Sequence, residues 1–326
     1  MPAYRLPLEL ELHILELVTP PLLMRHLAKR VEFLQTAALV HHSFTQWAQD
    51  KLHDHFAFKY DPVDKGLVRL KERLSAAKNN GGVPTRVHLD LTRYRNDGKP
   101  ERIREVFGTL EIIVDRLWIN PSAASVGMTD IFTEVSHFIL DDRCHRAGGP
   151  ALRGGGEGSD CASLKRLTHF ALYDAQLDAA PLCSPTVTYV AIYGSEVSSS
   201  VWERLFERLP NLQTLITFAS LPRPYIYEYL PASVENVHCV ETSLNEWTDA
   251  ALRAHRLPSN LPRLANFSLI VAVDQPRDAD RQTCKFNLLR EPLKCDTIPP
   301  GCRVKYELRV ADVDDVFDEL MLEYGF

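Results

Sequence analysis

Short β-rich runs recur along most of this chain, and their spacing restricts its fold more than any other feature. From residue 83 on, eight runs can be aligned on two core positions separated by one residue of the opposite face. The core pairs are Val87/Leu89, Leu117/Ile119, Phe138/Leu140, Phe170/Leu172, Val190/Ile192, Leu215/Thr217, Val237/Cys239 and Phe267/Leu269. Their first members lie 20 to 32 residues apart, which leaves room for a strand and a return segment in each interval. The pattern predicts an α/β fold.

The clearest copies carry leucine at three-residue steps before the strand. They are Leu164-x-x-Leu167-x-x-Phe170-x-Leu172, Leu209-x-x-Leu212-x-x-Leu215 and Leu261-x-x-Leu264-x-x-Phe267-x-Leu269. This arrangement resembles leucine-rich repeats, and helical patterns in two of the gaps, 199–209 and 245–255, fit return helices. The resemblance implies an irregular leucine-rich-repeat solenoid with a strand and a helix per repeat. An ordinary α/β domain is the alternative.

The composition excludes several classes of protein. With 326 residues, of which 45% are hydrophobic, the chain is long enough for a sizeable core. The net charge of −6 argues against a nucleic-acid partner. The longest uncharged run, 179–195, contains two prolines and is too short to cross a membrane, so we expect no membrane partner. The N-terminus lacks the apolar core of a secretory signal, which favours an intracellular protein, cytoplasmic or nuclear.

No pattern of reactive or metal-binding side chains stands out. The seven cysteines are scattered and include no Cys-x-x-Cys pair, so we expect neither a metal site nor a disulfide framework. Cys144 and His145 follow a predicted strand and could suggest a hydrolase, but neighbouring residues in a turn seldom form a working nucleophile and base. We therefore predict no catalytic residue, no cofactor and no enzymatic activity.

The first 60 residues have a helical pattern. Apolar residues recur at helical spacing from Leu8 to Val18, where the Pro20-Pro21 pair follows, and again from Phe33 to Phe58. We expect a small helical bundle with more apolar surface than it can cover alone, so that part of it meets a partner. The predicted domains are a helical domain at 1–60, a linker helix at 61–82 and the repeat domain at 83–326.

The segment 5–58 resembles an F-box in the form common in fungal F-box proteins. The matching residues are Leu6-Pro7-x-Glu9-Leu10, Ile14-Leu15 and Leu39-Val40-x-x-Ser43-Phe44-x-x-Trp47-Ala48. The resemblance implies binding to the Skp adaptor of a Skp-cullin-F-box ubiquitin ligase. The predicted adaptor-binding residues are Leu6, Pro7, Leu10, Ile14, Leu39, Val40, Phe44 and Trp47. Packing within the helices is the alternative, above all for Leu15, Val18, Val40 and Phe44.

If the strand alignment holds, the residues beside each core pair share the opposite face of the sheet. Aromatic side chains gather there on adjacent strands, as they do on protein-binding surfaces. The predicted substrate-binding residues are Trp118, Tyr173, Tyr189, Tyr193, Phe218 and His238. The alternative is that other parts of the chain cover these side chains.

A final strand is predicted at 304–310 and a final amphipathic helix at 312–324, which we expect to cap the last repeat. Together these features predict a non-enzymatic F-box protein that selects a protein substrate for ubiquitination. A leucine-rich-repeat scaffold that carries a degenerate F-box and serves no ligase is the alternative.

Overall fold

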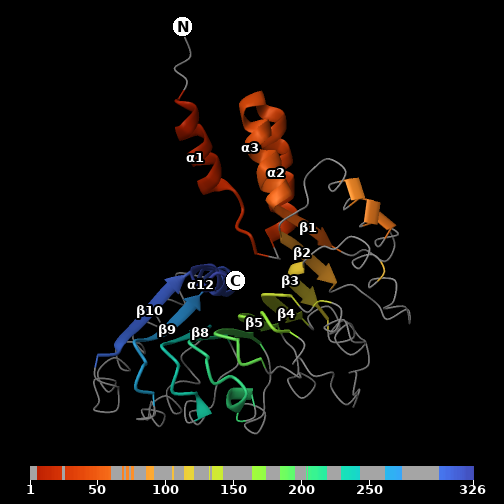
Figure 1. Ribbon diagram of the computed structural model, residues 1–326. Helices are drawn as coiled ribbons and strands as arrows, with labels where there is room; N and C mark the ends of the chain where they lie inside the picture. The colour runs from red at the N-terminus through yellow and green to blue at the C-terminus, as the bar shows by residue number, and fades with distance from the viewer. Residues whose placement is uncertain are drawn as a thin grey trace, which may run out of the picture. The chain divides into compact units, whose positions relative to one another are not determined.

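A computed structural model covers the whole chain, which divides into two compact units, Met1–Ile119 and Asn120–Phe326. The residues that the structure describes are 6–23, 26–59, 68–69, 71–72, 75–76, 86–91, 105, 114–120, 132, 134–141, 164–173, 184–194, 203, 205–218, 229–242, 261–273 and 301–326. Figure 1 shows the elements of both units, each of which is described by itself below.

The first unit combines helices with the beginning of a sheet. Its elements are α1 (Leu8–Val18), α2 (Leu27–Val40), α3 (His42–Asp54), β1 (His55–Lys59), β2 (Arg86–Leu91) and β3 (Val114–Ile119). The helices α2 and α3 pack on each other and bury Leu34, Ala37 and Ala48. Among the described residues, no helix combines the length and the apolar character needed to cross a bilayer.

Helix α1 adds no buried residue to this packing. Seven of its eleven residues are Leu, Ile or Val, yet none of the eleven is buried. Its sequence is strongly helical, and Pro7 precedes its first turn, where a missing N–H costs nothing. The element therefore forms largely from local propensity, and most of its apolar side chains are exposed, while Leu12 and Leu15 are half-buried.

The second unit contains the remaining strands and the last helix. Its elements are β4 (His137–Asp141), β5 (His169–Tyr173), β6 (Tyr189–Tyr193), β7 (Thr214–Phe218), β8 (Asn236–Glu241), β9 (Asn266–Val273), β10 (Arg303–Val310) and α12 (Val313–Glu323). Neighbouring strands of this unit pair in parallel, and the ten strands follow chain order in a single sheet.

The register of this sheet confirms the strand alignment from Phe138 to Phe267. Phe138 pairs with Phe170, and the series continues through the first core positions of β6 to β9. Near β2 the alignment is wrong by two residues, because a register shift after Val87 pairs Leu89 with Leu117. The leucines at three-residue steps before β5, β7 and β9 are buried. The turn that leads into each of these strands therefore packs against the core.

Consecutive residues along these strands are buried, so both faces of the sheet are covered. The residues of β7 are all buried, and β5 and β8 bury every residue after the first. Parallel sheets commonly have both faces covered, because the connections between parallel strands cross the faces of the sheet. The open face expected beside the core pairs does not exist on these strands.

The predicted architecture, a helical F-box bundle followed by a leucine-rich-repeat solenoid with a capping helix, is wrong, although the α/β class is right. A single ten-stranded parallel sheet dominates the chain and begins at β1, within the segment expected to be helical. The N-terminal helices do not close into a bundle, because α1 buries no residue.

Of the two return helices expected, the described residues show part of one. In the described residues after β3, α12 is the only long helix, and residues 203 and 205–207, within the return helix expected at 199–209, are also helical. The return helix expected at 245–255 lies outside the described residues. Helix α12 contacts β7, β8 and β9, so it crosses the face of the sheet and does not cap its last strand.

Candidate functional site

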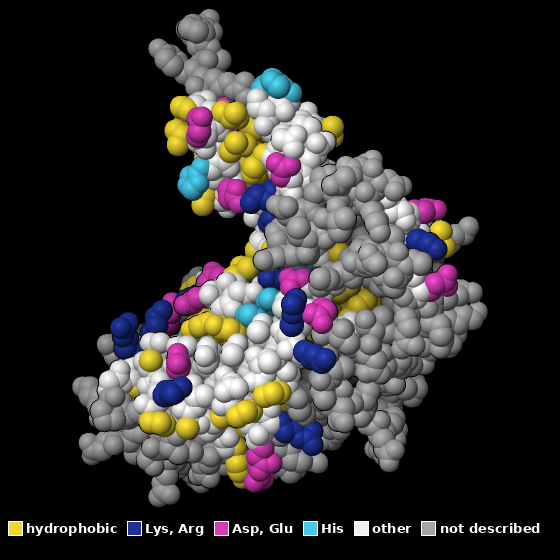
Figure 2. Space-filling view, viewed as in Figure 1, with side chains coloured by type: hydrophobic (Ala, Val, Ile, Leu, Met, Phe, Trp, Pro, Cys, Tyr) yellow, Lys and Arg dark blue, Asp and Glu magenta, His cyan; other side chains and the backbone are white. Residues whose placement is uncertain are grey.

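Large apolar side chains are exposed on the N-terminal helices, and we call them the N-terminal apolar surface. On and before α1, Leu10 is 50% exposed, Ile14 46% and Leu17 72%. These three recur at steps of four and three residues, which places them along one side of the helix. The surface also includes Leu6, Leu8 and Val18, and Leu39 and Val40 at the end of α2. Figure 2 shows hydrophobic side chains at the surface of these helices, at the top of the view.

The structure exposes six of the eight residues predicted to bind the adaptor, and half-buries the other two. The exposed six are Leu6, Pro7, Leu10, Ile14, Leu39 and Val40. Phe44 and Trp47 are half-buried on α3, where the Phe44 ring lies 5.6 Å from that of His41. The prediction omitted Leu8 and Leu17, although Leu17 continues the spacing of Leu10 and Ile14 and could have been found from it.

Polar contacts join α1 to α3. The Glu16 carboxylate accepts from the Lys51 ammonium at 2.5 Å and from the Trp47 indole N–H at 3.4 Å. The hydrogen bond from Lys51 is the main cause that lowers the pKa of Glu16. Exposed ion pairs stabilise weakly. These contacts therefore orient α1 without covering its apolar side chains.

In the second unit, α12 lies on the sheet face that we predicted to bind a target. The Tyr173 hydroxyl donates to the Met321 sulfur at 3.0 Å, and the Tyr193 hydroxyl donates to the Asp314 carboxylate. The Phe317 ring meets both tyrosines edge-on, with centroids 6.0 Å from Tyr173 and 5.3 Å from Tyr193. We use the name covered face for the sheet side chains that contact residues 313–326. They are His137, His169, Tyr173, Tyr189, Tyr193, His238 and Arg309.

Two stacked histidines on the covered face hold the residues after α12. The rings of His137 and His169 are parallel, with centroids 4.1 Å apart. Each Nε2 donates to a backbone carbonyl at 2.9 Å, His137 to Gly325 and His169 to Tyr324. The Phe326 ring is buried and meets His169 edge-on. Sequence analysis missed both histidines, though their equal positions at the start of adjacent strands were a usable signal.

A third histidine, His238, is buried between two hydroxyl groups. Its Nδ1 lies 2.6 Å from the Ser268 Oγ, and its Nε2 lies 2.6 Å from the Tyr324 Oη. Burial, with a smaller contribution from the charge of Lys305, lowers the pKa of His238 to about 4. Burial also raises the pKa of Tyr324 to about 12. At neutral pH both groups are uncharged, so one histidine nitrogen donates and the other accepts.

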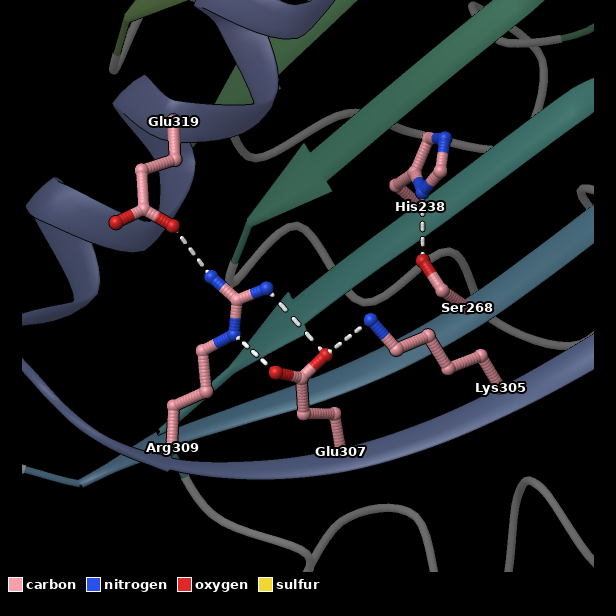
Figure 3. A network of polar contacts seen from close by, with 6 residues as sticks. All are labelled: His238, Ser268, Lys305, Glu307, Arg309 and Glu319. Atoms are coloured by element: carbon pink, nitrogen blue, oxygen red, sulfur yellow. Dashed lines mark hydrogen bonds and ion pairs between the residues drawn. The ribbon is translucent and has the colours of Figure 1, made fainter.

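An ion-pair network ties the last strand to α12, as Figure 3 shows. Glu307 accepts two hydrogen bonds from the Arg309 guanidinium, at 2.6 and 3.3 Å, and pairs with Lys305 at 2.6 Å. Arg309 also pairs with Glu319 of α12 at 2.5 Å. The two contacts with Glu307 are the fork geometry that makes guanidinium–carboxylate pairs specific. The network fixes the charged side of α12 against β10.

The six predicted substrate-binding residues are therefore not an open surface. Tyr173, Tyr193 and His238 contact residues of the C-terminal segment, and the Tyr324 ring lies 6.1 Å from Tyr189. Phe218 is buried beside Tyr193. Trp118 is buried on β3 in the first unit. The alternative reading, that another part of the chain covers these side chains, describes the second unit correctly.

One histidine of the covered face lies within hydrogen-bond distance of a serine. Ser268 and His238 have the separation of a nucleophile and its base, but both are buried beside Tyr324. A histidine with a pKa of about 4 is also a weak general base at neutral pH. Among the described residues, no group of three or more potential ligands could hold a metal ion. Cys144 and His145 lie outside the described residues.

Comparison of this chain with protein-family models, with curated proteins and with solved structures finds no match.

Proposed function

We propose that this protein is the substrate-recognition subunit of a Skp-cullin-F-box ubiquitin ligase, with the Skp-type adaptor bound at the N-terminal apolar surface. One observation supports the proposal most: α1 buries none of its residues although it is rich in leucine. Clusters of large exposed apolar side chains are typical of protein interfaces. The residues that resemble an F-box supply most of this surface, which is why the partner we propose is the adaptor.

In this proposal the protein performs no chemistry of its own. It holds a target protein beside the conjugating enzyme that the ligase carries, and the high effective concentration of target lysines drives transfer. The proposed place of action is the cytoplasm or the nucleus. The required partners are the adaptor, the cullin core and one protein target.

The test is adaptor binding by purified full-length protein, measured by isothermal titration. We expect the variant Leu10→Ala/Ile14→Ala/Leu17→Ala to bind the Skp adaptor at least about 100-fold more weakly, because each of the three lost apolar anchors costs ~1 kcal/mol or more of binding free energy. The matched control is His13→Ala, which changes an exposed polar residue of the same helix and leaves adaptor binding unchanged.

Circular dichroism of each variant checks that the helices remain. Wild-type protein that fails to bind the adaptor at micromolar concentration would refute the proposal and favour a scaffold without a ligase. Equal binding by the wild type and the triple variant would refute the assignment of α1 as the adaptor-binding helix.

A further inference from the structure

The side chains of the covered face leave space for one helix to pack closely against the sheet. On β5 and β6 the residues that share this face are large at both ends of the strand and small in the middle, where Ala171 pairs with Ala191. Both alanines are fully buried. The Tyr173 and Tyr193 rings stack at 5.3 Å beside them, and both contact Phe317. A strip of small side chains beside aromatic ones lets a helix approach the sheet closely.

The contacts to α12 are of a kind that a helix from another molecule could make equally well. They include an apolar stripe with Phe317, Leu320 and Met321, all buried, and two backbone carbonyls held by His137 and His169. None of these contacts depends on the covalent link to β10. A helix with the same stripe and a similar C-terminal turn would satisfy them.

The charge of α12 specifies the kind of helix. Residues 311–326 include six acidic side chains and no Lys or Arg. The covered face meets this charge with the Tyr193 hydroxyl at Asp314 and with Arg309 at Glu319. These complementary groups belong to β6 and β10, so they remain on the sheet when the helix leaves.

We propose that the covered face is the target-binding surface, and that an acidic amphipathic helix of the target protein takes the place of α12 there. The proposal rests on the function proposed above, to which it adds the chemistry of the target. Helix α12 then acts as an internal competitor, present at high effective concentration because only Ala311 and Asp312 separate it from β10.

The test adds a fluorescent peptide of residues 311–326 to full-length protein and measures anisotropy. The receptor variant is Phe317→Ala/Met321→Ala, which weakens the internal helix and leaves the sheet intact. We expect this variant to bind the peptide about tenfold or more tightly than wild-type protein does. A peptide with the same two substitutions is the matched control, and it should bind at least about tenfold more weakly than the natural one.

A further substitution in the receptor variant, Tyr193→Phe, removes the hydroxyl that contacts Asp314. Peptide binding should then weaken severalfold, which places the peptide on the covered face. If the folded receptor variant does not bind the natural peptide, α12 is a permanent part of the core and the proposal is wrong.

Amide hydrogen exchange on wild-type protein keeps the proposal testable if the variant does not fold. We expect the amides of α12 to exchange at least about tenfold faster than those of β5 to β8, because the helix must open without the sheet. Equal protection of helix and strands would refute the proposal. Neither experiment contains the adaptor, so a failure here is distinct from a failure of adaptor binding.

Discussion

His238 shows what burial does to a single titratable side chain. In the folded protein its pKa is about 4, compared with 6.5 for an ordinary histidine, chiefly because burial disfavours the charged ring. As the pH falls below 6.5, the unfolded chain therefore takes up a proton before the folded one does. The stabilising contribution is complete above pH 6.5 and decreases as the pH falls towards 4.

We predict that the free energy of unfolding decreases by about 2 kcal/mol between pH 7 and pH 5 because of this histidine. The variant His238→Gln should lose that part of the pH dependence, and His13→Gln, at an exposed position on α1, should keep it. Urea unfolding at the two pH values, followed by circular dichroism, measures the difference. Identical pH dependence in wild-type protein and His238→Gln would contradict the assignment.

At the scale of elements, α12 has a defined beginning and a defined end. The Asp312 carboxylate accepts from the Asp314 N–H at 2.8 Å and caps the first turn. At the other end, the Gly325 N–H donates to the Leu322 carbonyl, and the Phe326 N–H donates to the Met321 carbonyl. This is the Schellman arrangement, with Gly325 in the left-handed region at φ +83°. The cap presents the carbonyls that His137 and His169 bind.

The glycine in this cap gives an element-scale prediction. Replacing Gly325 by Ala should lower the free energy of unfolding by about 1 kcal/mol, because an alanine is strained at positive φ. The added Cβ itself meets nothing closer than the His169 Nε2 at 3.6 Å, so crowding contributes little. Gly325→Asn is the matched control, since asparagine tolerates this conformation, and its loss should be smaller. Urea unfolding compares the two, and equal losses would contradict the reasoning.

Helix α1 illustrates the opposite case, an element that contacts its own chain without burying any of its residues. Its apolar pattern is as regular as that of α12, yet α12 buries five residues and α1 none. The amphipathic pattern predicted both helices. It could not predict which of them packs against this chain, because the periodicity describes a face and not the surface opposite it.

At the scale of the whole molecule, stability should depend on the buried sheet and hardly at all on α1. Phe170 is 1% exposed on β5, and Leu10 is half exposed on α1. We predict that Phe170→Ala lowers the free energy of unfolding by about 3–5 kcal/mol, through lost burial and the cavity left behind. Leu10→Ala should change it by no more than about 0.5 kcal/mol. Chemical unfolding measures both, and a large loss in Leu10→Ala would show that α1 belongs to the core.

The strands and their register were predictable from the sequence alone. The alternation at Phe138, Phe170, Val190 and their equivalents correctly predicted which residues align across β4 to β9. It erred at Val87, where an irregularity shifts the pairing. Alternation and leucine spacing are local properties, so a linear sequence contains them completely.

The sequence by itself determined the α/β class, the positions of most strands, the amphipathic stripe of α12 and the exposed leucines that resemble an F-box. Only the tertiary structure decided that α12 covers the face with Tyr173 and Tyr193, and that α1 stays uncovered. The physical reason is distance along the chain: Tyr193 and Asp314 are 121 residues apart. Which distant apolar surfaces meet depends on the shape and packing of the whole fold, and a periodic pattern carries no information about either.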